Sequence, residues 1–226
     1  MGNKQPQNEI PKLRKSELEE FSKQSLLLPS VIERLYNHFY RISRIHSADG
    51  VIDMSEFCFT IKKHETSLLI ERIFHMFDTN SDKVINFREF ILGISTFSDN
   101  QDLLIRENSA IAAIRMKEKI DYSMRIYDLK SAKKVYQSDL LEILSSVIKE
   151  KAFSNLTKKQ VKSIVRRTMK IEICQEDEFG KYWDSETYAK MVMKNPQIFK
   201  WIAVDIEAIK HEIKLGRNVA KCFSLY

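Results

Sequence analysis

The stretch Asp78-Thr79-Asn80-Ser81-Asp82-Lys83-Val84-Ile85-Asn86-Phe87-Arg88-Glu89 carries the strongest structural signal in this chain. Oxygen-bearing side chains stand at positions 1, 3, 5, 9 and 12 of these twelve residues. That spacing is typical of a loop that wraps Ca²⁺ in side-chain oxygens, one backbone carbonyl and a bidentate terminal Glu. It predicts one calcium ion held by the following ligands: Asp78, Asn80, Asp82, the Val84 carbonyl, Asn86 through water, and Glu89.

The residues around this loop predict an EF-hand, in which helices precede and follow the loop. Ile85 at position 8 would form the short strand of the loop. Lys83 departs from the pattern, because position 6 normally holds a Gly that turns sharply. A lysine there costs roughly 1–2 kcal/mol of backbone strain and brings a positive charge near the ion. We therefore expect micromolar affinity for calcium or weaker, and Mg²⁺ could occupy the loop at rest.

The composition favours a helix-rich protein. The 226 residues include only 5 Gly and 4 Pro, and 30% of them are charged. The three cysteines, Cys58, Cys174 and Cys222, form no disulfide framework and suit a reducing cytosol. No apolar run approaches the roughly 20 residues that span a bilayer, and no secretory signal pattern opens the sequence. These features predict an all-α protein of the cytoplasm.

The net charge of +6 is unevenly placed. Residues 1–100 carry 13 Lys and Arg against 14 Asp and Glu, a net of −1, whereas residues 101–226 carry 24 against 17, a net of +7. The basic half could face acidic lipid, an acidic partner segment or nucleic acid, or it could be an ordinary solvated surface. It shows no interleaving of aromatic and basic residues, so we predict no nucleic-acid partner.

A weaker copy of the loop precedes the intact one. Ile52 can serve as its strand residue and Glu56 as its terminal acid. Twelve residues counted back from Glu56 begin at Ile45, whose side chain cannot ligate. A fourteen-residue loop from Ser43 to Glu56 begins on a hydroxyl instead. The candidate side-chain ligands of a second metal site are therefore Ser43, Asp49 and Glu56.

Two further copies have lost most of their ligand oxygens. The third runs from Asp128 to Asp139 and the fourth from about Gln175 to Glu186. Residues unsuited to calcium stand at four positions of the third: Lys130, Ala132, Lys133 and Lys134. Phe179 and Trp183 replace ligands in the fourth. Lysines inside a loop disfavour a divalent ion, so the third copy is interpreted as structural.

Loops of this kind fold in pairs, because their short strands hydrogen-bond to each other. We expect residues 51–53 to pair with residues 84–86, and Val135 to pair with Tyr182. The predicted fold is two lobes of paired EF-hands, four helix–loop–helix units in all, with additional helices at both termini. Three capping-box pairs are expected to begin helices: Ser16 with Glu19, Ser30 with Glu33, and Thr157 with Gln160.

The predicted organisation has five parts. They are a flexible tail at 1–15, a first lobe at 16–98, a connector at 99–116, a second lobe at 117–195 and a C-terminal amphipathic helix with its tail at 196–226. The last part rests on Ile198, Ile202, Ile206, Ile209 and Ile213, which have helical spacing. This helix could pack permanently in the core, plug a groove until a partner displaces it, or seek a partner freely.

With these features the chain resembles the calcineurin B superfamily, which comprises calcineurin B, the calcineurin B-like sensors and the calcineurin B homologous proteins. The resemblance spans roughly residues 1–200. It rests on seven stretches, namely 18–21, 32–39, 49–57, 71–78, 87–90, 125–129 and 195–196. Loops three and four are more degraded than is usual in the family, and the C-terminus lacks the Phe-Pro-Ser-Phe motif of the plant sensors.

The resemblance implies a regulatory subunit without catalytic activity of its own. Such proteins bind an amphipathic helix from a protein kinase, a phosphatase catalytic subunit or a membrane transporter. The resemblance also suggests that the first loop binds calcium through backbone carbonyls and Glu56. Met1-Gly2-Asn3 is similar to the family's N-myristoylation start, although Pro6 stands where the acylation signal prefers Ser or Thr.

One acyl chain binds membranes only marginally, so membrane association through Gly2 would need the neighbouring basic residues as a second signal. They are Lys4, Lys12, Arg14 and Lys15.

Two functions follow, and a third is unsupported. The first is a calcium-responsive regulatory subunit. The second is a scaffold whose loops have decayed, so that calcium changes nothing. The chain shows no paired metal-binding histidines, no Cys–His arrangement and no phosphate-binding Gly loop. We therefore predict no enzyme activity.

Overall fold

The computed structural model describes residues 10–61, 68–97, 109–149 and 157–195. The predicted all-α architecture is confirmed, with one small sheet. The elements in chain order are α1 (Lys15–Ser25), α2 (Pro29–Ile42), α3 (Met54–Ile61), α4 (Leu68–Phe77), α5 (Phe87–Phe97), α6 (Ser109–Tyr127), β1 (Lys134–Tyr136), α7 (Gln137–Lys149), α8 (Lys158–Thr168), β2 (Gln175–Asp177), β3 (Gly180–Asp184) and α9 (Ser185–Lys194).

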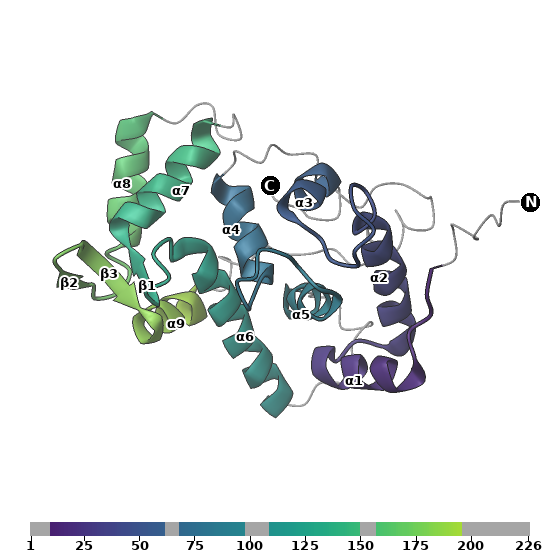
Figure 1. The fold of residues 1–226 in the computed structure, drawn as a ribbon. Helices are drawn as coiled ribbons and strands as arrows, with labels where there is room; N and C mark the ends of the chain where they lie inside the picture. The colour runs from purple at the N-terminus through teal and green to yellow at the C-terminus, as the bar shows by residue number, and fades with distance from the viewer. Residues whose placement is uncertain (1–9, 62–67, 98–108, 150–156, 196–226) are drawn as a thin grey trace, which may run out of the picture.

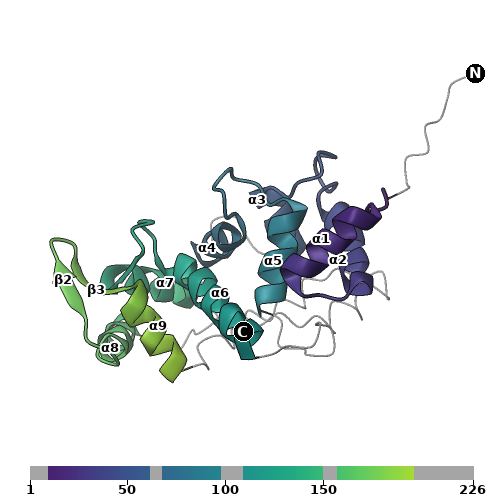
Figure 2. The ribbon, with the colours of Figure 1, turned by 90° about the horizontal axis from the view of Figure 1, so that it is seen from below.

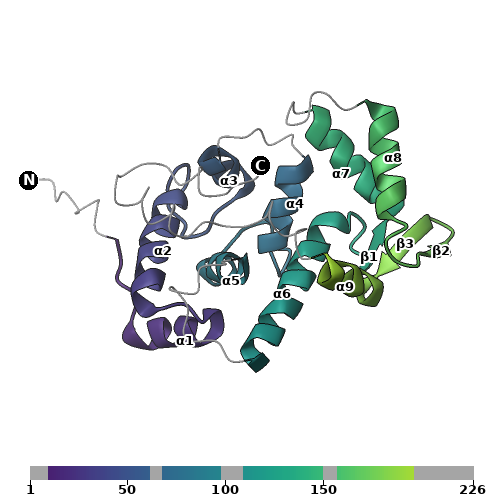
Figure 3. The same ribbon diagram turned by 180° about the vertical axis from the view of Figure 1, so that it is seen from behind.

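The helices divide into two groups that meet along α4 and α6. Helices α1, α2, α3 and α5 lie on one side, and α7, α8, α9 and the strands lie on the other (Figure 1). The view from below and the view from behind show the same order (Figures 2 and 3). One continuous hydrophobic cluster, from Leu27 to Val192, runs through both groups. The predicted connector at 99–116 overlaps the first turns of α6, which begins at Ser109.

Arg72 on α4 joins the two groups through the end of α6. Its Nε donates to the Ile126 carbonyl at 3.2 Å, and its Nη2 donates to the carbonyls of Asp128, at 2.8 Å, and Arg125. These carbonyls lie where α6 ends and have no partner within the helix. A guanidinium there also complements the negative end of the helix dipole. Arg72 therefore fixes the helix that precedes the second loop to the helix that precedes the third.

The first two loops pair as expected. Ile52 and Ile85 form an antiparallel bridge, with N–H to carbonyl distances of 2.9 and 2.8 Å in the two directions. Both side chains are essentially inaccessible to solvent. The bridge confirms the predicted pairing of residues 51–53 with residues 84–86.

The last two loops pair differently from the prediction. The sheet has the order β1-β3-β2, and Val135 lies opposite Trp183, not Tyr182. The predicted register was wrong by one residue, because the fourth loop was counted from Gln175, whereas β2 and β3 form a hairpin in which Asp177 pairs with Gly180. Trp183 is 1% exposed and belongs to the core, which fixes the strand in this register.

The revised register also changes the end of the fourth loop. If Trp183 takes the strand position, position 9 is Asp184 and position 12 is Thr187, not Glu186. The Asp184 carboxylate caps α9 by accepting a hydrogen bond from the Thr187 N–H at 2.8 Å. A threonine cannot supply the bidentate carboxylate that ends a calcium loop.

One of the three predicted capping pairs is confirmed. Thr157 and Gln160 form the capping box of α8. The pair Ser16 and Glu19 is wrong, because α1 begins earlier and Glu17 accepts the Arg14 N–H at 2.8 Å. The pair Ser30 and Glu33 is wrong as well, because Pro29 already stands in the first turn of α2.

His38 on α2 is 9% exposed, and its Nε2 has no hydrogen-bond partner. Burial, with a smaller contribution from the charge of Arg41, lowers the pKa of His38 from 6.5 to about 4. The unfolded chain therefore binds more protons than the folded protein between these values. The stabilising contribution is complete above the unfolded pKa and is lost as the pH falls toward the folded one.

We expect the free energy of unfolding to fall by roughly 2 kcal/mol between pH 7 and pH 5 on account of His38 alone. The measurement is urea unfolding near pH 7 and near pH 5, for the unmodified protein and for His38→Leu. The variant should lose much of the difference between the two pH values. An unchanged difference would assign the acid sensitivity to other groups.

Candidate metal centre

The second loop lies between α4 and α5, with Asp78 directly after the last residue of α4. Asp78 is 2% exposed, and its carboxylate accepts the Asp82 N–H at 3.1 Å and the Lys83 N–H at 3.0 Å. Lys83 has a φ of 69°, so it adopts the left-handed conformation that the sequence pattern requires of position 6. The loop therefore makes its sharp turn without a glycine, with the Asp78 carboxylate holding the turn.

The polar side chains in the middle of the loop are ordered by one another. Asn80 Nδ2 donates to Asp82 Oδ2 at 2.8 Å, and Asp82 Oδ1 accepts the Val84 N–H at 3.1 Å. Both side chains belong to exposed residues. Asn80 Oδ1 accepts the Asp82 N–H at 3.0 Å, so each side-chain oxygen of this pair accepts a hydrogen bond within the loop.

Glu89 is 5% exposed and binds both ends of the loop to the start of α5. Its Oε1 accepts the Thr79 N–H and hydroxyl, both at 2.9 Å, and the Asn80 N–H at 3.2 Å. Its Oε2 accepts the N–H and the side-chain amide of Asn86, at 3.1 and 2.8 Å. Both carboxylate oxygens are thus directed into the loop, where a bidentate ligand is required.

The donor set fits a hard divalent cation. It combines three carboxylates, two amide oxygens and a backbone carbonyl, which are the oxygen ligands that Ca²⁺ prefers. Within the described residues, however, no three or more His, Cys, Asp or Glu side chains converge closely enough to form a ready-made metal site. Asp78, Asp82 and Glu89 would have to exchange hydrogen bonds within the loop for bonds to an ion.

Glu89 also couples the loop to the aromatic core, because Phe87 and Phe90 share its helix. The Phe87 ring lies 5.1 Å from that of Phe21 and 5.0 Å from that of Tyr36. On the next turn, a Cβ added to Gly93 would lie 2.4 Å from the Phe77 ring, so α5 approaches α4 very closely. A change in the position of Glu89 must therefore shift the packing between α5 and α1, α2 and α4.

The first loop has the same hydrogen-bonding pattern as the second when the two are aligned from their terminal acids, Glu56 and Glu89. The Glu56 carboxylate accepts the N–H groups of His46, at 3.2 Å, and Ser47, at 3.4 Å, just as Glu89 accepts those of positions 2 and 3. Asp49 accepts the Val51 N–H at 3.1 Å, as Asp82 accepts that of Val84. This alignment places the two extra residues of the fourteen-residue loop at its start.

The alignment adds two candidate ligands that the sequence analysis missed. They are Ser47 at position 3 and Asp53 at position 9; the latter accepts the Glu56 N–H at 2.7 Å. Both lie at ligand positions of the count of twelve from Glu56, which was set aside because it begins at Ile45. Ser43 is directed elsewhere, since its hydroxyl donates to the Tyr40 carbonyl at 3.3 Å. Ile45 takes position 1, so this loop lacks its first ligand.

The third loop keeps the backbone of the second and loses its ligands. Asp128 accepts the N–H groups of Ala132, at 3.0 Å, and Lys133, at 2.7 Å. Lys133 has a φ of 54°, close to that of Lys83. Among the four loops that the structure describes between successive helices, only the second has oxygen ligands at all the positions that calcium requires.

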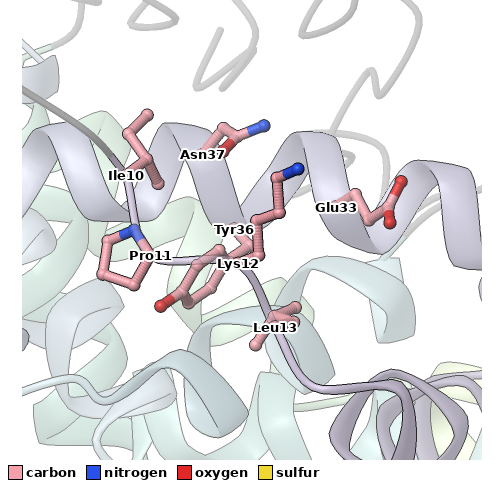
Figure 4. A pocket seen from close by; sticks show the side chains of 7 residues that line it. All are labelled: Ile10, Pro11, Lys12, Leu13, Glu33, Tyr36 and Asn37. Atoms are coloured by element: carbon pink, nitrogen blue, oxygen red, sulfur yellow. The ribbon is translucent and has the colours of Figure 1, made fainter.

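A separate cavity of about 410 Å³ lies beside α2 (Figure 4). The segment Ile10–Leu13 crosses the helix there, and the side chains of Glu33, Tyr36 and Asn37 complete the wall. The cavity combines one base, Lys12, and one acid with mainly apolar neighbours. This chemistry identifies no particular ligand.

No helix in the described part of the chain combines the length and apolar character needed to cross a bilayer. Gly2 and the C-terminal isoleucines lie outside the described residues. The predictions of acylation and of an amphipathic C-terminal helix therefore stay predictions.

Several curated proteins are similar to this chain, among them three calcineurin B subunits. A calcineurin B subunit from Candida glabrata is 30% identical over 138 residues, which cover 61% of this chain and 67% of that protein. A type 2 calcineurin B subunit from Dictyostelium discoideum is 29% identical over 157 residues, covering 70% and 75%. A calcineurin B subunit from Naegleria gruberi is 26% identical over 168 residues, covering 74% and 81%. No family model matches the chain.

Proposed function

Because the chain belongs to the calcineurin B superfamily, we propose that it is a non-catalytic regulatory protein that binds calcium and an amphipathic helix of a phosphatase catalytic subunit. The observation that carries the proposal is the position of Glu89. This residue ends the loop with the full ligand set and begins α5, whose rings pack on α1 and α2. Calcium at Glu89 would therefore change the packing of the first lobe.

The proposed site holds one calcium ion. Asp78, Asn80, Asp82, the Val84 carbonyl and Glu89 bind it directly, and Asn86 acts through water. Mg²⁺ competes for the site at rest, but it demands a tighter octahedral shell and fits a bidentate Glu poorly. The first loop is a weaker candidate, because Ile45 offers no oxygen at position 1.

Helices from protein kinases or transporters remain alternative partners, and the related proteins lend them no support.

A second candidate function is a scaffold that acts without calcium. It is favoured by the third loop, where lysines replace ligands. The two functions differ in whether partner binding responds to calcium at Glu89.

The test uses a fluorescent peptide with the sequence of the helix through which a calcineurin catalytic chain contacts calcineurin B. Its affinity for the purified protein is measured by anisotropy, with calcium and with chelator. The proposal predicts tight binding that weakens at least tenfold with chelator and in Glu89→Gln. Equal affinity in all conditions would support the scaffold, and no binding would exclude this class of partner. A peptide with charged residues at its apolar positions is the control.

A further inference from the structure

The third and fourth loops meet in a cluster of lysines, aromatic rings and acids. Lys130 and Lys134 come from the third loop, at positions 3 and 7. They lie beside the rings of Tyr136, Phe179 and Tyr182, the last two of which belong to the hairpin of the fourth loop. Two of the rings also contact each other, since the Tyr136 and Tyr182 centroids are 5.4 Å apart, with the ring planes tilted by 51°.

Lys130 places a positive charge where the second loop has a calcium ligand. Its ammonium lies 3.8 Å from Asp139 Oδ1 at position 12 and 3.9 Å from the centre of the Tyr136 ring at position 9. The Phe179 ring, 5.2 Å away, faces it from the hairpin. Asp139 is 2% exposed, and its Oδ2 has no hydrogen-bond partner. Its Oδ1 accepts the Ser138 hydroxyl at 3.0 Å, and the Lys130 ammonium offsets part of the cost of burying this carboxylate.

Lys134 makes the second connection between the loops. Its ammonium donates to Asp177 Oδ2 at 2.7 Å and lies 4.1 Å from the centre of the Tyr182 ring. The Tyr136 hydroxyl donates to the same oxygen of Asp177 at 2.9 Å. The hydrogen bond from Lys134 lowers the pKa of Asp177, so this carboxylate stays ionised near neutral pH.

We propose that Lys130 and Lys134 are tethered cations that hold the third and fourth loops together in place of calcium. Each ammonium binds a loop carboxylate and an aromatic ring, a combination that attracts a cation through both charge and the ring quadrupole. The second lobe is thereby set in one conformation whether or not calcium is present. Any response to calcium is then confined to the first lobe and reaches the second only through their shared core.

The test measures hydrogen exchange of residues 134–136 and 180–184 in the full-length chain with chelator present. Lys130→Met and Lys134→Met keep the length of the side chain and remove its charge. Each should speed exchange of these strands about tenfold, the effect of losing one ion pair with its cation–π contact. Lys130→Arg should keep the protection. Lys162→Met, at an exposed lysine on α8, is the matched control.

Exchange in Lys130→Met and Lys134→Met that equals exchange in Lys162→Met would overturn the proposal. A second variant guards against simple misfolding. Lys130→Asp combined with Ala132→Asp restores carboxylates at positions 3 and 5, so protection of the strands should fall with chelator and return with calcium. Protection in this variant that equals that of the unmodified protein with chelator present would show that Lys130 is not needed to hold the loops.

Discussion

Replacing Glu89 by Gln should abolish the rise in melting temperature that calcium produces. The substitution keeps the size of the side chain but removes the charge and one of the two oxygens of the bidentate ligand. For the unmodified protein, calcium at 100 times the dissociation constant contributes about 2.7 kcal/mol, which raises the melting temperature by roughly 5–10 °C in a chain of this size. The measurement is thermal unfolding with millimolar calcium and with chelator.

Two matched variants locate the effect. Glu56→Gln changes the equivalent residue of the first loop, and Asp139→Asn that of the third. Both should retain the full calcium-dependent rise, because the first loop lacks a ligand at position 1 and the third loop has lysines at positions 3 and 7. A rise lost in Glu56→Gln but kept in Glu89→Gln would move the site to the first loop.

Replacing Arg72 by Met should lower the free energy of unfolding by roughly 2–3 kcal/mol. The variant keeps most of the aliphatic stem but removes the donors to the carbonyls of Arg125, Ile126 and Asp128. The carbonyls of Arg125 and Ile126 are then left to water or to none, while that of Asp128 keeps the Ser131 N–H at 3.4 Å. The measurement is urea unfolding at a fixed calcium concentration.

The same variant also tests communication between the lobes. The Arg72 guanidinium fixes α4 to the end of α6. Hydrogen exchange around the third loop should therefore accelerate in Arg72→Met, while calcium affinity changes little. Arg88→Met, at an exposed arginine on α5, is the control and should cost little stability. An Arg72→Met protein as stable as this control would show that the hydrophobic core alone joins the lobes.

Local sequence predicted those features that depend on local chemistry. The second loop could be interpreted residue by residue, because each ligand position and the turn at Lys83 is set by spacing within twelve residues. The bridge between Ile52 and Ile85 followed from the same count. The capping box of Thr157 was predicted for a similar reason, since its partner Gln160 lies only three residues away.

Features that depend on distant contacts were missed. The pairing of Val135 with Trp183 is decided by burial of the Trp183 ring, which shifts the register by one residue from the loop count. The start of the first loop was ambiguous, because only the hydrogen bonds to Glu56 show where its two extra residues lie. The lysines of the third loop were interpreted as lost ligands, since their aromatic and acidic partners are up to about fifty residues away.

The most direct test of the central claim is a calorimetric titration of calcium into the metal-stripped protein, with Mg²⁺ present. We predict one site of micromolar or weaker affinity that is absent in Glu89→Gln. Heat that survives in Glu89→Gln would place the ion in another loop. An absence of both heat and thermal stabilisation up to millimolar calcium would contradict the account and leave a scaffold that works without calcium.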